Sequence, residues 1–246
     1  MNTINKARLK SGSGQVLTAP ERTIPRPVNQ IGFWSAVFAT VFSIGYGIAV
    51  IVMVVSTITA AERPSSLTGI ELIVATFQPV QMLPLIPSLL LVPTFVRLMV
   101  SIHYYAAPEK KIWSHLGIAF ALIYASMSAI NYITQLTVVR LSILNQETDG
   151  LSMFVMGNSH SIFWALASSY AFMNLAMLFA GPVFEGGRLE QSIRRLFYAN
   201  GASAVITIFG VAVDSPMIYL LGSLVPWCVI FSWATLLLAI LFKRNS

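Results

Sequence analysis

Apolar residues in this chain are concentrated in long runs, which polar, charged or proline-containing stretches separate. A helix rises about 1.5 Å per residue, so a run of roughly 20 apolar residues can cross the hydrocarbon layer of a bilayer. Six runs have a suitable length: residues 31–59, 72–105, 113–139, 161–184, 196–213 and 216–242. We therefore predict an all-α, polytopic transmembrane helix bundle whose six spans fill residues 31–242.

The composition favours the same class of protein. Hydrophobic residues make up 56% of the chain and charged residues 10%, and the mean hydropathy is +0.75. Soluble domains have a charged fraction of about 25%. The net charge of +6 does not indicate a nucleic-acid partner, because the charges lie at the ends of the apolar runs. We expect the lipid bilayer to be the main partner.

The basic residues predict an orientation in the membrane. Along six alternating spans, 13 Lys and Arg residues fall on one side and only Arg63 and Arg140 fall on the other. Cytoplasmic segments are enriched in Lys and Arg. We therefore expect the basic N-terminal arm (residues 1–30) and the tail (243–246) to be cytoplasmic, in an inner or plasma membrane. The first run exceeds the roughly 7–15 residues of a signal-peptide core, so we expect it to be retained as a span.

Small residues recur every four positions on two predicted spans. The series are Ser35, Ala39, Ser43 and Gly47 on the first span, and Gly117, Ala121, Ala125 and Ala129 on the third. Membrane helices associate through close approach at small residues, because lipid supplies no hydrophobic driving force between them. We predict that both series are helix-packing faces. The alternative is that alanine and glycine are simply common in membrane helices.

The second run differs from the others in its proline content. It contains Pro79, Pro84, Pro87 and Pro93, with Gln78 and Gln81 beside the first of them. An interior proline removes a backbone donor and clashes with the preceding turn. A straight helix over residues 71–105 would be about 52 Å long, so it must tilt, project from the bilayer or break. A broken helix could expose its backbone to a substrate, as in transporters, whereas a kinked structural helix would have its freed carbonyls satisfied by neighbours.

A charged side chain lies within the second run. If Tyr104 and Tyr105 mark an interface, Arg97 lies about two turns inside the membrane, where charge is costly. Its long side chain can carry the guanidinium back to the headgroups. If it instead points into the bundle, it would form a polar cluster with Asn174 and Asn200, which lie at a comparable depth.

A second set of amides lies toward the opposite interface. Asn131 and Gln135 are one turn apart on the third span, at the depth of Gln78 and Gln81. Buried amides can bind a small polar ligand. They can equally act as hydrogen-bonding links between helices, typically worth about 0.6 kcal/mol each.

No motif in the sequence names a reaction, a metal or a cofactor. Cys228 is the single cysteine, which excludes an intramolecular disulfide and a multi-cysteine metal site. His103 and His115 are expected near one interface and His160 near the other, so we predict interfacial side chains and no metal ligands. No nucleophile elbow, glycine-rich phosphate loop or HExxH helix occurs, so we predict no catalytic residue and no cofactor.

Three short stretches resemble uncharacterised six-span prokaryotic integral membrane proteins. They are residues 131–137 (NYITQLT), 163–166 (FWAL) and 198–201 (YANG). The resemblance covers the third to fifth spans. It implies a six-helix membrane architecture and no activity.

The leading functional hypothesis is a small-solute permease or channel-like protein with its site near the proline-rich second span. The candidate ligand-binding residues are Gln78, Gln81, Asn131, Gln135, Arg97, Asn174 and Asn200. The alternative is a non-transporting component that binds lipid or a partner subunit, and a lipid-modifying enzyme has the least support. A hydrated cavity that reaches Gln78, Asn131 and Gln135 would favour the permease, and a dry hydrogen-bonded core would favour the alternative.

Overall fold

The structure is a computed structural model that describes residues 26–59, 66–155 and 161–245. Within these residues, all regular secondary structure is helical, and six helical units are long and apolar enough to cross a membrane. The predicted fold class is therefore confirmed. The units are α1 (Arg26–Thr59); η1 (Pro79–Met82) with α3 (Leu85–Tyr105); α4 (Lys111–Thr134) with η3 (Gln135–Val139) and α5 (Arg140–Leu144); α6 (Ile162–Ala167) with α7 (Ser169–Ala180) and η5 (Gly181–Val183); α8 (Arg188–Ala212); and α9 (Pro216–Val225) with η6 (Pro226–Phe231) and α10 (Ser232–Arg244).

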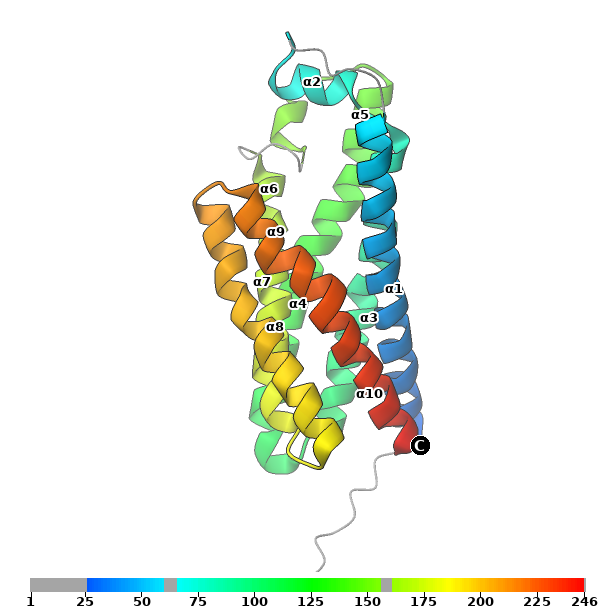
Figure 1. The fold of residues 1–246 in the computed structure, drawn as a ribbon, viewed down its shortest axis with the longest axis vertical. Helices are drawn as coiled ribbons and strands as arrows, with labels where there is room; N and C mark the ends of the chain where they lie inside the picture. Colours follow the sequence, from blue (N-terminus) through cyan, green and yellow to red (C-terminus); the bar gives the residue numbers. More distant parts are fainter. Residues whose placement is uncertain (1–25, 60–65, 156–160, 246) are drawn as a thin grey trace, which may run out of the picture.

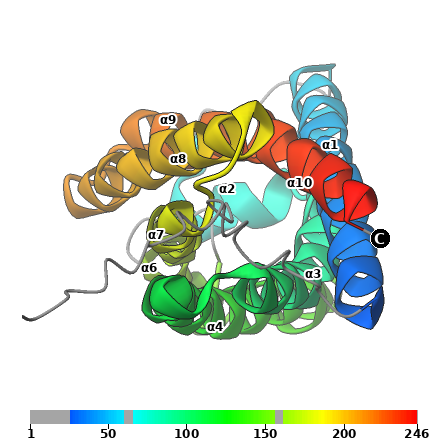
Figure 2. The ribbon, with the colours of Figure 1, turned by 90° about the horizontal axis from the view of Figure 1, so that it is seen from below.

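The six units form a ring in chain order, as the view along the bundle shows (Figure 2). Each unit packs against the one before it and the one after it, and α10 returns to pack against α1. At this closure the side-chain amide of Asn29 donates a hydrogen bond to the backbone carbonyl of Asn245. The start of α1 and the end of α10 therefore lie at the same end of the bundle (Figure 1).

That end of the ring carries most of the basic side chains, and we call it the basic end. Its basic residues are Arg26, Lys110, Lys111, Arg188, Arg194, Arg195, Lys243 and Arg244. At the opposite end, the α2 end, Arg140 is the only Lys or Arg among the described residues. The basic residues are therefore divided between the two ends of the bundle as expected for six spans of alternating direction. Which end faces the cytoplasm stays a prediction.

The second apolar run is broken, which is one of the three outcomes that its length allowed. Residues 69–75 form a separate helix, α2 (Gly69–Ala75), which lies across one end of the ring (Figure 1). Gln78 is extended (φ −131°, ψ 138°), as a residue before proline favours, and η1 starts at Pro79. The side-chain amide of Gln81 donates to the carbonyl of Thr76 at 3.1 Å and so bridges the break. Residues 72–75 therefore belong to α2 and not to the span.

Two other helices extend beyond their apolar runs. α8 begins at Arg188, eight residues before the predicted start at 196, because its first two turns are amphipathic and not apolar. The third span continues past residue 139 to Leu144 through the wide π-helical turn of η3. The length of the apolar run therefore underestimates the length of both helices. Their charged ends are expected to project from the bilayer core.

The small-residue face of α1 packs against the last span. Ser43 donates to the carbonyl of Trp227 at 2.9 Å and shares a hydrogen bond of 2.8 Å with the hydroxyl of Ser232. Ser35 and Ala39 are completely buried on the same face. At Gly47 an added Cβ would lie 3.5 Å from the sulfur of Cys228.

The small-residue face of α4 has different neighbours. An added Cβ at Gly117 would lie 2.8 Å from Cε of Met99 on α3 and 3.0 Å from the carbonyl oxygen of Ala176 on α7. Ala121 is fully buried, whereas Ala125 and Ala129 are half-buried against the core. The two series therefore lie in different helix contacts and do not form one common interface.

The basic half of the ring is filled with aromatic side chains. Phe184 packs edge-on against Phe197 with ring centroids 5.3 Å apart, and Tyr105 lies 6.0 Å from Phe184 and 6.1 Å from Phe242. All three phenylalanines are at most 1% exposed. Lys110 and Glu185 form an ion pair of 2.5 Å across the same end.

Candidate functional site

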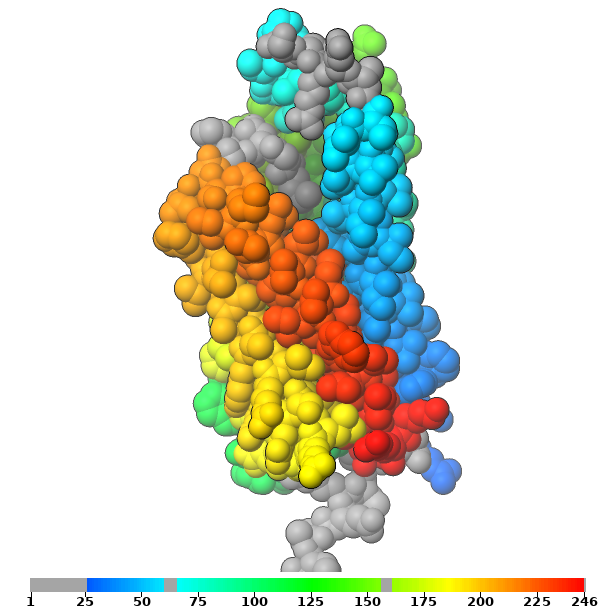
Figure 3. Space-filling model, in the orientation of Figure 1, coloured from blue at the N-terminus to red at the C-terminus, as the bar shows by residue number. Residues whose placement is uncertain are grey.

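A cavity of about 270 Å³ lies inside the ring, in the half nearer the α2 end. Side chains of α1, η1, α3, α4, α6, α7 and α9 line it, so all spans except the fifth contribute. Figure 3 shows the surface hollowed between α1 and α9 on this half of the molecule. Because five aromatic side chains line it, we call it the tyrosine cavity. They are Tyr46, Tyr132, Trp164, Tyr170 and Tyr219.

The aromatic side chains form a continuous chain of ring contacts. Trp164 lies 5.1 Å from Tyr219 between ring centroids, and Tyr219 lies 6.5 Å from Tyr170. Behind them Trp227, which is 1% exposed, lies 4.7 Å from Tyr170 and stacks on Tyr46 at 4.1 Å with an interplanar angle of 12°. Trp227 belongs to the π-helical segment η6, where Pro226 interrupts the regular hydrogen bonding. The π turn therefore presents Trp227 as a support for two cavity rings.

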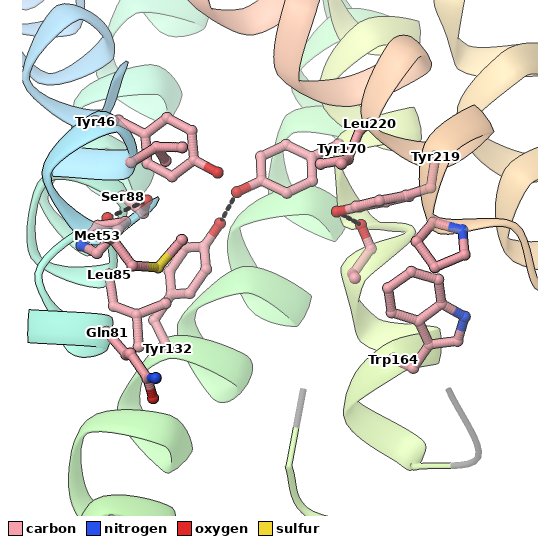
Figure 4. A pocket seen from close by; sticks show the side chains of 14 residues that line it. Tyr46, Met53, Gln81, Leu85, Ser88, Tyr132, Trp164, Tyr170, Tyr219 and Leu220 are labelled. Carbon is pink, nitrogen blue, oxygen red and sulfur yellow. Dashed lines mark hydrogen bonds between the residues drawn. The ribbon is translucent and has the colours of Figure 1, made fainter. Parts of the chain in front are cut away.

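The phenol hydroxyls are oriented by specific contacts. Tyr132 and Tyr170 share a hydrogen bond between their hydroxyls, and Tyr219 donates to the carbonyl of Ala167 at 3.2 Å. In Figure 4 the hydroxyl of Tyr46 points toward the Tyr132–Tyr170 pair. Among the described residues, nothing hydrogen-bonds to the Tyr46 hydroxyl and no charged side chain lines the cavity. The site thus offers aromatic faces and phenol oxygens but no ion-pair partner.

A second cavity of about 340 Å³ adjoins the first toward the α2 end. The two share Met53, Gln81 and Leu85 as lining residues. Gln135 also lines the second cavity, and its amide donates to the carbonyl of Phe154 at 2.6 Å. The polar groups near the break in the second span therefore mark the boundary between the two cavities.

The structure brings together only part of the predicted ligand site. Gln81 and Gln135 line cavities, whereas Gln78 and Asn131 line neither of the two, although Asn131 is buried. Arg97 is exposed on the outer face of α3, so the cluster with Asn174 and Asn200 that an inward-pointing side chain would have formed is not present. A side chain on that face can extend toward the headgroups, which is the first of the two readings of its position.

Asn174 and Asn200 are fully buried and hydrogen-bonded to each other. The amide of Asn200 donates to Oδ1 of Asn174 at 2.7 Å, and the amide of Asn174 donates to the hydroxyl of Ser203 at 2.9 Å. Asn174 also reaches the carbonyl of Gly222 at 3.4 Å, so it joins α7 to both α8 and α9. These amides link helices and line neither cavity.

Replacing Asn174 with leucine should therefore destabilise the bundle. Hydrogen bonds between membrane helices contribute about 0.6 kcal/mol each, and loss of Asn174 also leaves the buried amide of Asn200 with fewer partners. We expect a loss of about 2 kcal/mol, measured by denaturant unfolding of the purified protein in detergent. Asn145→Leu is the matched control because Asn145 is exposed. Equal stability of the two variants would contradict a linking role for Asn174.

The two described histidines, His103 and His115, are neighbours in the structure. Nδ1 of His103 lies 2.8 Å from the hydroxyl of Ser114, and the rings of His103 and His115 lie 4.2 Å apart near the basic end. In the described part of the chain no group of three or more His, Cys, Asp or Glu could hold a metal. His160 lies outside the described residues.

Sequence reasoning identified none of the five cavity aromatics as a site residue. Trp164 and Tyr219 lie near the ends of predicted spans, where an interfacial position would explain them, and Tyr132 directly follows Asn131. Tyr46 and Tyr170 carry the signal that could have identified the site. Both lie well inside apolar runs, where the interfacial preference of tyrosine does not explain them.

The comparisons with other proteins add no family to this description. No protein-family profile, no curated protein and no solved structure matches the chain.

Proposed function

We propose that this integral membrane protein is a small-solute permease whose substrate occupies the tyrosine cavity. The observation that carries the proposal is a ligand-sized cavity inside a closed ring of spans, beside the break in the second one. Ligand sites are commonly concave, mostly apolar and equipped with a few convergent polar groups. Transporters place such sites next to interrupted helices.

The asymmetry between the two halves of the ring supports a carrier. Toward the α2 end the cavity adjoins a second one, whereas toward the basic end Phe95, Tyr124 and Phe231 close the lumen. All three of these residues are at most 1% exposed. A site that is open to one side and closed to the other corresponds to one state of an alternating-access cycle.

Accessibility of a single cysteine tests this proposal without knowledge of the substrate. The background variant is Cys228→Ala, which removes the native thiol. Met53→Cys then places a thiol in the wall shared by both cavities, and Met99→Cys places one in the packed half, where Met99 is 0% exposed. A cationic, membrane-impermeant methanethiosulfonate is applied to one face of sealed vesicles at a time.

A permease should expose Met53→Cys to both faces, rapidly from the α2 end and more slowly from the basic end. Met99→Cys should react at least about tenfold more slowly than Met53→Cys from the α2 end, because packed side chains exclude the reagent. If Met53→Cys reacts from the α2 end alone, the protein would be a non-transporting ligand-binding protein and the permease proposal would be wrong. No reaction from either face would show that the cavity admits no solute.

A further inference from the structure

The chemistry of the tyrosine cavity suggests which class of solute it accepts. The cavity contains aromatic rings, phenol oxygens and aliphatic side chains, and no charged residue among those described. The amide of Gln81 and the hydroxyl of Ser88 also line it, and both already donate to backbone carbonyls. A strongly hydrated polar solute would lose its water there without gaining a charged partner or many hydrogen bonds. An anion would face the negative side of the π systems and the phenol oxygens. Both classes are therefore disfavoured.

A weakly hydrated organic cation fits these walls. The faces of tryptophan and tyrosine attract cations, and clusters of such rings recognise quaternary ammonium groups. Here Tyr46, Trp164, Tyr170 and Tyr219 come from four different elements, α1, α6, α7 and α9, so the rings surround the cavity from several sides. The Trp227 ring behind Tyr46 and Tyr170 limits their rotation. The cluster is therefore oriented before any ligand arrives.

The phenol hydroxyls strengthen the preference for positive charge. The hydroxyls of Tyr46, Tyr132 and Tyr170 converge in Figure 4. Within the Tyr132–Tyr170 pair a single hydrogen bond uses one proton, so lone pairs on both oxygens remain. These oxygens present partial negative charge to the cavity. A cation without N–H groups gains from this charge without needing a hydrogen bond.

The charges at the α2 end provide an independent observation. Its described acidic residues are Glu71, Glu147, Asp149 and Asp214. Arg140 is the one basic residue among the described residues at this end, and all five side chains are exposed. Asp214 stands two residues before Pro216, which lines the cavity. A net negative rim attracts cations and raises their concentration at the entrance.

We propose that the tyrosine cavity binds small lipophilic organic monocations, typified by quaternary ammonium compounds. This inference rests on the proposed function, because it names the substrate class of the same site. The volume of about 270 Å³ suits a compact cation with one ring or a few short alkyl groups. The cation enters past the acidic rim, and its charged group sits among the rings of Tyr46, Trp164, Tyr170 and Tyr219.

The test measures protection of the cavity thiol in the Cys228→Ala, Met53→Cys protein, purified in detergent. The reagent is an uncharged methanethiosulfonate, so that it does not itself favour either ligand class. The ligands are benzyltrimethylammonium and the matched pair of choline and 3,3-dimethylbutan-1-ol, in which carbon replaces the charged nitrogen. Choline should protect at a concentration at least about tenfold lower than the alcohol requires, because a desolvated cation gains strongly from aromatic faces. Benzyltrimethylammonium should protect better than choline.

Ring variants locate the bound cation. Trp164→Leu should weaken protection by benzyltrimethylammonium about tenfold, and Trp164→Phe, which keeps an aromatic face, should restore most of it. Tyr170→Leu and Tyr170→Phe form a second pair on another element. Trp233→Leu is the control, because Trp233 is 58% exposed on the outside of the ring. Equal loss in the leucine and phenylalanine variants would overturn the role of the rings.

The outcomes separate the two proposals. Equal protection by choline and its uncharged analogue would overturn the cation preference and indicate an apolar occupant, such as a lipid chain. Reaction of Met53→Cys without protection by any of the three compounds would overturn the ligand class while the accessible cavity of the proposed function stands. If Met53→Cys does not react at all, both the permease proposal and the proposed ligand class would be overturned.

Discussion

Replacing Gly222 with alanine should destabilise the protein more than any single substitution in the cavity. An added Cβ at Gly222 would lie 2.4 Å from the backbone nitrogen of Thr207 and 2.8 Å from its hydroxyl. These atoms belong to α8 and cannot move aside as a flexible side chain would. The hydroxyl of Thr207 also donates to the carbonyl of Gly222 at 2.7 Å, and this bond depends on the same close approach. Overpacking of this kind costs about 3 kcal/mol when the neighbouring backbone must shift.

The measurement is the midpoint of thermal unfolding in detergent, together with the yield of monodisperse protein. Gly210→Ala is a second instance, since its Cβ would lie 2.3 Å from the backbone nitrogen of Tyr219. Gly187→Ala is the matched control, because no atom lies within 4 Å of its Cβ position. An unchanged midpoint for Gly222→Ala would show that α8 and α9 are farther apart than described.

The α8–α9 contact shows a limit of reasoning from sequence. Helix packing was predicted from unbroken four-residue series on the first and third spans. Among the described glycines, however, the two that lie nearest to the backbone of another helix are the isolated Gly210 and Gly222. A single glycine has no periodic signature, and only its partner helix reveals whether the missing side chain is required. The number of spans was predictable because it depends on lengths of apolar sequence, which lipid constrains directly.

The candidate site, like the helix packing, was predictable from the sequence only in part. The prolines of the second span left open whether it would break or only kink. The amides Gln81 and Gln135 are conspicuous in apolar runs, and both line the second cavity beside the break. The aromatic lining was not predictable in this way. Tyrosine and tryptophan are favourable in a bilayer interface and in a packed core alike. Their convergence from α1, α6, α7 and α9 arises from the ring closure, which a pattern within one helix does not encode.

The closed basic half and the open α2 half also affect how the two functional hypotheses are weighed. A dry, hydrogen-bonded core was expected for a non-transporting component, and the network of Asn174, Asn200 and Ser203 has that character. A cavity that reaches Gln78, Asn131 and Gln135 was expected for a permease; the same ring holds a cavity, but of these three residues only Gln135 lines it or the adjoining one. Because both features occur in one molecule, the network serves as a hydrogen-bonded support for the helices that line the cavity.

Thiols at the two ends of the ring should react from opposite sides of the membrane. In the Cys228→Ala background, Asn245→Cys tests the basic end and Asp149→Cys tests the α2 end, and both positions are exposed. The described residues place eight basic side chains at the basic end and one, Arg140, at the α2 end. Such a bias orients membrane proteins with the basic side in the cytoplasm. An impermeant maleimide added to intact cells should therefore label Asp149→Cys and leave Asn245→Cys unlabelled until the cells are opened.

The contrast between these two positions should be nearly complete, because orientation is decided during insertion and the bilayer blocks the reagent. Labelling of Asn245→Cys alone in intact cells would show that the orientation is the opposite of the expected one, with the acidic rim facing the cytoplasm. Labelling of both positions from one side would contradict the three spans between residues 149 and 245, and with them the ring. With the expected result, the tyrosine cavity opens toward the external side. A cation drawn to the acidic rim then moves inward, which is also the direction that an inside-negative membrane potential favours.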